Sequence, residues 1–259
     1  MTNYEFVEKL LEVTKYKTKY AKGTFGQNAT DSFINKKAKQ YPEWYSASRV
    51  NSLKALPDDT KLFDCVGLIK GVMWGFPNIV YTSNGVKDYN DQTIYDASTN
   101  KSTNFADLQV GDLLWIKGHV GVAIGDYKAI ECTNAWSGTV QITGIGNFNR
   151  SFAGLNVRKW TSHAKLPFIT YVETPSNAPQ GSATSEKQSS DNLSHPVLQK
   201  GSKGESVKEL QRLLKDKGFD PNGIDGDFGN NTLNALKGFQ SKVFVTGVTD
   251  ERTWNELYK

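Results

Sequence analysis

A cysteine stands at the predicted start of a helix, within residues 63–71. Asp64 precedes Cys65, and an aspartate at that position caps a helix by accepting backbone N–H bonds from its first turn. The helix is indicated by apolar residues at helical spacing, namely Leu68, Ile69, Val72 and Met73. The positive end of a helix dipole favours a thiolate and lowers the thiol pKa, so Cys65 suits a nucleophile. The alternative is a small buried cysteine that packs beneath the helix.

A predicted β-hairpin about fifty residues later carries a histidine and a glutamate. Residues 119–125 and 128–133 have the pattern of strands, joined by a turn at residues 125–127. Side chains alternate between the faces of a strand, so if the apolar residues share the core, His119 and Glu131 share the opposite face. A three-residue turn gives this register, whereas a two-residue turn does not.

Such a pair suits general base catalysis beside a thiol. An imidazole can take the thiol proton, and a carboxylate can orient the ring and fix its tautomer. Taken singly, a structural histidine and a solvated glutamate are ordinary alternatives, but together with Cys65 the set predicts a catalytic triad. The chain has three histidines, and neither His163 nor His195 has a comparable sequence setting.

These residues resemble the motifs of the NlpC-type peptidoglycan peptidases, and those of phage endolysins most closely. The resemblance rests on Asp64-Cys65-Val66-Gly67-Leu68, on Gly118-His119-Val120-Gly121-Val122, and on a polar residue twelve positions after the histidine. It covers about residues 10–150 and implies a papain-like cysteine hydrolase that cuts the peptide part of bacterial cell walls. Many relatives carry histidine or asparagine as the third residue, whereas this chain has Glu131.

The resemblance also implies a role for Tyr20, in the glycine-punctuated turn expected at residues 18–26. In the related peptidases a tyrosine in a similar block lies beside the nucleophile, so Tyr20 is the candidate for assisting the oxyanion site. The alternative is an aromatic anchor for the loop. Residues 43–61 either wall the substrate groove or form an irregular connection.

The elements around these motifs predict an α+β domain with an antiparallel sheet. Helices are expected at residues 5–15 and 30–41, and a loop-rich region at 75–107 contains one short helix at 88–97. Further strands are expected at residues 111–116, 139–143, 156–160 and 165–172.

The composition changes after Glu173. Residues 174–194 contain eight Ser or Thr, two Pro and no aromatic residue, which predicts a flexible linker. Residues 195–259 resemble the three-helix peptidoglycan-binding domain, with helices expected at 207–214, 232–240 and 247–254; Ser206 is the expected cap of the first. A helical interaction domain for another partner is the alternative. The domains are therefore 1–173 (catalytic), 174–194 (linker) and 195–259 (wall-binding).

The net charge, the apolar stretches and the cysteine number limit the kinds of partner and compartment that can be expected. A net charge of +4 is too weak to argue for nucleic acid, and no stretch is apolar and long enough to span a membrane. The two cysteines do not make a disulfide scaffold, and both are expected as free thiols. No cofactor or metal is expected, and the chain is expected to be monomeric. The N-terminus lacks the apolar core of a signal peptide, so synthesis in a host cytoplasm and later release to the wall are expected.

The sequence therefore predicts a modular cell-wall hydrolase. Resemblance favours a D-glutamyl–diamino acid endopeptidase, with an N-acetylmuramoyl-L-alanine amidase as the alternative. Two alternatives belong to other functional classes: a non-catalytic wall-binding adaptor, and an acyltransferase of the same fold.

Overall fold

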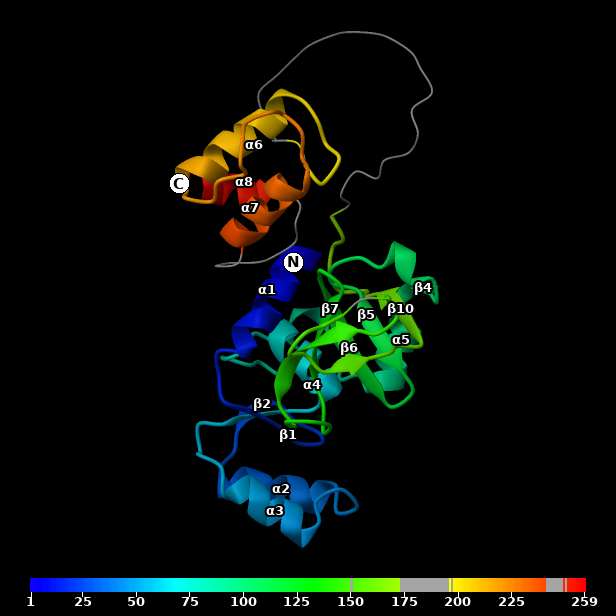
Figure 1. Ribbon diagram of the computed structural model, residues 1–259. Helices are drawn as coiled ribbons and strands as arrows, with labels where there is room; N and C mark the ends of the chain where they lie inside the picture. Colours follow the sequence, from blue (N-terminus) through cyan, green and yellow to red (C-terminus); the bar gives the residue numbers. More distant parts are fainter. Residues whose placement is uncertain (150, 173–195, 197, 241–248, 250) are drawn as a thin grey trace. The chain divides into compact units, whose positions relative to one another are not determined.

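The computed structural model in Figure 1 describes residues 1–149, 151–172, 196, 198–240, 249 and 251–259. The chain divides into two units, Met1–Tyr171 and Val172–Lys259. The first unit mixes helices and sheets, and the second is helical, so the chain is α+β with a separate helical part. The predicted linker, residues 174–194, lies outside the described residues.

The helices of the first unit begin after polar side chains that accept a backbone N–H of the first turn. They are α1 (Asn3–Val13), α2 (Asp31–Gln40), α3 (Ala47–Lys54), α4 (Cys65–Met73) and α5 (Asp91–Ala97). Their caps are, in the same order, Thr2, Thr30, Ser46, Asp64 and Asn90. Helix α3 falls within the segment expected to be a groove wall or an irregular connection. The sequence gives little sign of α3, because Leu53 is its one buried residue.

The main sheet has seven strands in the order β4-β10-β5-β6-β7-β8-β9, shown in green in Figure 1. All neighbouring pairs are antiparallel except β8 and β9, which are parallel. The strands are β4 (Thr99–Ser102), β5 (Leu113–Ile116), β6 (His119–Gly125), β7 (Lys128–Cys132), β8 (Val140–Ile145), β9 (Val157–Arg158) and β10 (Ser162–Lys165).

A smaller sheet replaces the turn that was expected at residues 18–26. Strands β1 (Thr18–Tyr20), β2 (Phe25–Asn28) and β3 (Lys61–Phe63) pair in the order β1-β3-β2. Only the residues between β1 and β2 turn, and Gly23 there has a φ of 76°. The strands are short and contain few apolar residues, so they give no clear period-two pattern.

The strand expected at residues 165–172 is wrong, because β10 ends at Lys165. The Leu166 N–H donates to the Tyr171 hydroxyl at 3.0 Å instead of to a neighbouring strand. Pro167 has no N–H to offer a sheet. The buried residues of β10 therefore lie earlier, at Ser162 to Ala164.

Helix α4 contacts α1, β2, β6 and β7, and its position is set by two glycines. A Cβ added at Gly67 would lie 1.8 Å from the Thr24 carbonyl oxygen. One added at Gly71 would lie 2.1 Å from the Phe25 carbonyl oxygen. The backbone of α4 therefore lies directly against the β2 segment, which fixes where the helix begins.

The second unit contains α6 (Glu205–Asp216), α7 (Asn230–Gln240) and α8 (Glu251–Leu257). The cap of α6 is Gly204, not Ser206, which lies inside the first turn. The apolar residues packed together are Leu198, Val207, Leu210, Leu214, Phe228, Ala235, Leu236, Trp254 and Leu257. The described residues of this unit thus form a small helical core of their own.

Candidate functional site

Asp64 fixes the start of α4. Its Oδ1 accepts the Gly67 N–H at 2.5 Å, and its Oδ2 accepts the Gly23 N–H at 2.8 Å. One carboxylate thus caps α4 and ties it to the turn between β1 and β2. Burial raises the pKa of Asp64, and the nearby positive charge of Lys70 only partly offsets this rise. The expected cap is confirmed, and it presents Cys65 as the first residue of the helix.

Cys65 lines a cavity of about 900 Å³ and is 8% exposed. Burial raises the pKa of the Cys65 thiol to about 12, and the Asp64 carboxylate adds to the rise. The backbone N–H groups of Val120 and Val66 act in the opposite direction but do not offset burial. The expected lowering of the thiol pKa at the helix start is therefore wrong, and the resting thiol is neutral.

His119 and Glu131 lie together, as the alternation of the two strands predicts. His119 Nε2 is 2.6 Å from Glu131 Oε2. Because an ionised carboxylate only accepts hydrogen bonds, Nε2 carries the hydrogen and Nδ1 remains available as an acceptor. In the described part of the chain, His119 has no second hydrogen bond at Nδ1.

The turn of this hairpin differs from the expected one, although the register is the same. Val122 pairs with Ile130, and the two residues Asp126 and Tyr127 form the turn with φ values of 48° and 57°. An irregularity between Ala123 and Gly125 places one additional residue in β6. A bulge of this kind compensates for the shorter turn, so a two-residue turn does give the register that joins histidine and glutamate.

Glu131 is fully buried, which excludes a solvated strand residue. Its Oε1 accepts the Thr143 hydroxyl at 2.7 Å, and its Oε2 accepts Arg158 Nε at 2.8 Å. The Arg158 guanidinium also donates to the Thr133 hydroxyl at 3.2 Å. The carboxylate is therefore charge-compensated and held in one orientation while it bonds the imidazole.

Two tryptophans complete this environment. The ring of Trp160 stacks on His119, with centroids 5.6 Å apart and planes inclined by 14°. The Arg158 guanidinium lies over the rings of Trp136 and Trp160, at 4.8 and 5.6 Å from their centroids. Sequence reasoning missed Arg158, Thr143 and Trp160. Thr143 had a usable signal, because β8 pairs Gln141 with Glu131 and residues two apart share a face.

Tyr20 lines the same cavity as Cys65. Burial raises the pKa of Tyr20 far above its ordinary value, and the nearby Cys65 contributes to the rise. Its hydroxyl is therefore neutral and able to donate a hydrogen bond. The ring packs against Trp44, with centroids 5.8 Å apart. Tyr20 thus has both features considered for it, an aromatic contact and a place beside the thiol.

Cys65 begins α4 and His119 begins β6, and these two ends lie next to each other. The Val120 N–H, which belongs to the residue after His119, interacts with the Cys65 sulfur. Gly118, the residue before His119, lines the cavity together with Cys65 and Tyr20. The site therefore contains a thiol, an imidazole backed by a carboxylate, and a neutral phenol.

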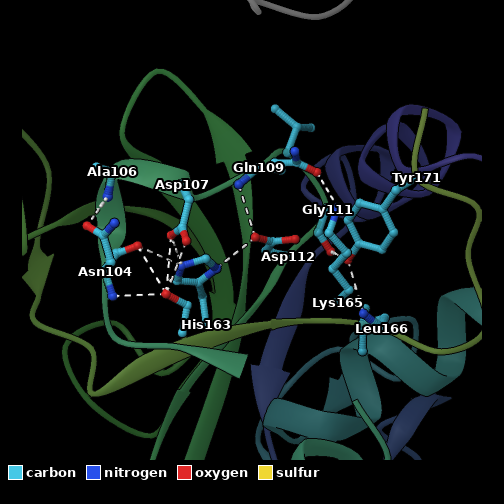
Figure 2. A network of polar contacts seen from close by, with 12 residues as sticks. Asn104, Ala106, Asp107, Gln109, Gly111, Asp112, His163, Lys165, Leu166 and Tyr171 are labelled. Atoms are coloured by element: carbon cyan, nitrogen blue, oxygen red, sulfur yellow. Dashed lines mark hydrogen bonds and ion pairs between the residues drawn. The ribbon is translucent and has the colours of Figure 1, made fainter. Parts of the chain in front are cut away.

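His163 has a hydrogen-bond network of its own, away from the residues predicted to be catalytic (Figure 2). Its Nδ1 lies 2.8 Å from Asp112 Oδ2, and its Nε2 lies 2.9 Å from Asp107 Oδ1 and 3.1 Å from the Asn104 carbonyl oxygen. Burial opposes charge on this ring, but the hydrogen bonds that His163 donates to Asp112 and to the Asn104 carbonyl prevail and raise the pKa of His163. Both ring nitrogens of His163 are hydrogen-bonded and the residue is 3% exposed. His163 therefore has a structural role in the sheet and is not the base for a nucleophile.

Cys132 lies in the core, and its thiol donates to the Phe63 carbonyl oxygen at 3.4 Å. Both cysteines are free, as expected. Among the described residues, no helix is both long enough and apolar enough to cross a bilayer.

The C-terminal part of the chain resembles known proteins. Residues 203–257 match the family described as a putative peptidoglycan binding domain. Two spore cortex-lytic enzymes of Bacillus cereus are 43% identical to this chain over 69 residues, which are 26% of this chain and 27% of each enzyme. A solved structure titled as the SleB N-terminal domain is 40% identical, covers 26% of this chain and 94% of that chain, and has a TM-score of 0.25.

The chain thus spans about 27% of the length of the curated relatives that it matches. The family match lies within the second unit. The family match and the similarity to the two curated enzymes support a cell-wall-related role for the chain. The chemistry of the first unit is therefore argued from the geometry of its own side chains.

Proposed function

We propose that the chain is a cysteine-dependent peptidoglycan hydrolase of the endolysin kind, with a papain-like first unit that cuts an amide bond in the stem peptide. The observation that carries this proposal is the 2.6 Å contact of His119 with the buried Glu131, at the end of β6 that adjoins the Cys65 thiol. The D-glutamyl–diamino acid bond is the first candidate. The family match at residues 203–257 supports peptidoglycan as the partner.

The reaction begins with a neutral thiol. His119 Nδ1 takes the Cys65 proton as the sulfur attacks the amide carbonyl, because a thiol with a pKa of about 12 holds little thiolate at neutral pH. Glu131 stabilises the imidazolium that forms and keeps Nε2 protonated. The carbon–sulfur bond forms while the carbonyl π-bond opens to an oxyanion.

The oxyanion needs donors that are already in place. The Cys65 backbone N–H at the start of α4 supplies one, and the neutral Tyr20 hydroxyl supplies a second. His119 then protonates the leaving amine, and the carbon–nitrogen bond breaks. Water, deprotonated by His119, attacks the thioester and releases the new carboxylate together with the free thiol.

The second unit acts by tethering. A module that holds the chain on the wall raises the local concentration of the amide without changing the chemistry. In this proposal the protein is made in a host cytoplasm and reaches the wall after release.

Digestion of purified peptidoglycan, followed by mass spectrometry of the products, tests the proposal. Wild type is expected to expose new amino groups on the diamino acid, and Cys65→Ala is expected to expose none. Cys132→Ala is the matched control, because it removes the other buried thiol and leaves the site intact.

The products also separate the alternatives. Release of intact stem peptides from the glycan would identify an N-acetylmuramoyl-L-alanine amidase with the same three residues. Absence of both products with wild type, while the chain still binds the wall, would replace the hydrolase with a non-catalytic adaptor.

A further inference from the structure

The cavity that contains Cys65 also contains a buried cation. Lys37, on α2, is 8% exposed and lines the cavity of about 900 Å³ together with Cys65 and Tyr20. Its position in the sequence looks like that of any surface lysine, because Lys36 and Lys39 beside it are exposed. Only the structure separates Lys37 from its neighbours.

Lys37 lacks a carboxylate partner within 4.0 Å among the described residues. Its Nζ donates to Gln40 Oε1 at 3.1 Å and lies over the rings of Phe33 and Tyr41, at 5.7 and 5.6 Å. Burial lowers the pKa of Lys37, because the charged ammonium loses hydration there. Buried charges in proteins are normally paired, so an unpaired one that lines a cavity is available to an anion.

The other charges around the cavity are compensated differently. Lys70 pairs with Asp88 and also donates to the Tyr89 carbonyl oxygen at 2.7 Å. Lys22 pairs with Glu43 at 3.0 Å. These two lysines therefore have their own anions.

Two further carboxylates line the cavity and are occupied by backbone donors. Asp64 accepts two N–H groups at the start of α4. Asp91 accepts the Gly118 N–H at 3.1 Å. Lys36 also lines the cavity and adds a second positive charge near Lys37. The α2 wall is thus the side that offers positive charge to a ligand.

We propose that Lys37 is a specificity residue that binds a free carboxylate of the stem peptide, so that the cavity discriminates against peptides in which this carboxylate is a carboxamide. The proposal rests on the proposed function for the identity of the ligand. The stem peptide offers two such carboxylates, one on the D-glutamyl residue and one on the diamino acid. An ammonium donates a charge-assisted hydrogen bond to either of them but gains much less from a neutral amide.

The test measures binding without turnover. The full chain with Cys65→Ala is titrated calorimetrically with L-alanyl-γ-D-glutamyl-diamino acid tripeptide. Two analogues are titrated in parallel, one with the D-glutamyl carboxamide and one with the diamino acid carboxamide. One of the two analogues is expected to bind about tenfold or more weaker, as for loss of a charged hydrogen bond, and its identity shows which carboxylate Lys37 binds.

Variants assign the discrimination to Lys37. Adding Lys37→Met, which keeps the length and the packing of the side chain, is expected to weaken the free tripeptide to the level of the carboxamide and to abolish the preference. Lys37→Arg is expected to keep the preference. Lys39→Met, on the same helix but exposed and outside the cavity, is the control and is expected to bind like the parent.

The inference is overturned if the tripeptide does not bind, if neither carboxamide weakens binding, or if Lys37→Met keeps the preference in a chain whose thermal unfolding matches that of the parent. The proposed hydrolase is judged separately, by cleavage of the same tripeptide with Cys65 present. Lys37-dependent binding without cleavage would support the carboxylate site and reject the endopeptidase.

Discussion

Glu131 has the least freedom of the candidate catalytic residues, because three side chains bind its two oxygens. Glu131→Gln keeps the shape and one carbonyl oxygen but loses the charge that stabilises an imidazolium. We expect it to lower kcat on peptidoglycan fragments, and by less than His119→Ala, which removes a base and acid worth about 10²- to 10⁴-fold. Steady-state kinetics of both variants measure this order. A Glu131→Gln enzyme as active as wild type would reduce Glu131 to a structural residue.

Arg158 is expected to matter for stability through the same carboxylate. Its side chain is largely buried, and its Nε bonds Glu131 Oε2 at 2.8 Å. Removing one partner of a buried ion pair leaves the other charge uncompensated and costs about 3–5 kcal/mol. We expect Arg158→Met to lower the free energy of unfolding by roughly this amount.

A double-mutant cycle in urea checks this expectation. Arg158→Met combined with Glu131→Gln should be less destabilising than the sum of the two single variants, since the double variant leaves no buried charge unpaired. Additive losses would mean that the pair does not couple.

The reactivity of Cys65 should follow from its raised pKa. Because burial holds the thiol pKa near 12 and the thiolate is the nucleophile, alkylation by iodoacetamide should still be rising at pH 10. In the unfolded chain an ordinary thiol pKa of about 8.5 should make the reaction level off near pH 9–10. The measurement uses Cys132→Ala, so that Cys65 is the only thiol. A plateau below pH 8 in the folded chain would instead indicate a resting thiolate–imidazolium pair.

At the scale of elements, the close contact of α4 with β2 determines where the thiol lies. A Cβ at Gly67 would lie 1.8 Å from the Thr24 carbonyl oxygen, and backbone atoms cannot rotate away. We expect Gly67→Ala to displace α4, to cost about 1–3 kcal/mol or more of stability, and to lower activity through the misplaced Cys65. Thermal unfolding and kinetics measure the two effects. Gly229→Ala is the control, since a Cβ there meets no atom within 4 Å; equal behaviour of the two variants would contradict the contact.

The sequence predicted those elements whose signals are local. The cap at Asp64 and the alternation around His119 and Glu131 depend only on residues that are close in the sequence. The start of α4 and the faces of the hairpin were therefore predictable. The bulge that allows the shorter turn was not, because it depends on how β6 pairs with β7.

Long-range pairing also hid part of the site. Arg158 reaches Glu131 from 27 positions along the chain, on a two-residue strand without a pattern of its own. His163 likewise joins Asp112 across 51 positions. The pKa of Cys65 was mispredicted because the helix start is a local feature, whereas the burial that outweighs it is a property of the folded unit.

For the whole molecule, the proposal assigns wall binding and amide cleavage to different units, so damage to one unit should spare the function of the other. Trp254 is a suitable residue for unfolding the second unit alone. It is 1% exposed in the core of that unit, and its Nε1 donates to the Pro196 carbonyl oxygen at 2.9 Å. Trp254→Ala should lower the free energy of unfolding of the second unit by about 3–5 kcal/mol. A domain of this size is rarely more stable than that, so the variant unit should unfold.

We therefore expect Trp254→Ala to abolish cosedimentation of the full chain with insoluble peptidoglycan while cleavage of soluble stem peptides continues at the wild-type rate. Asn255→Ala, exposed on the same helix, should leave both properties unchanged. Wall binding that persists after the second unit has unfolded would move the binding surface to the first unit. Loss of soluble-peptide cleavage together with binding would mean that the two units work as one, because tethering alone cannot affect a substrate that is already free in solution.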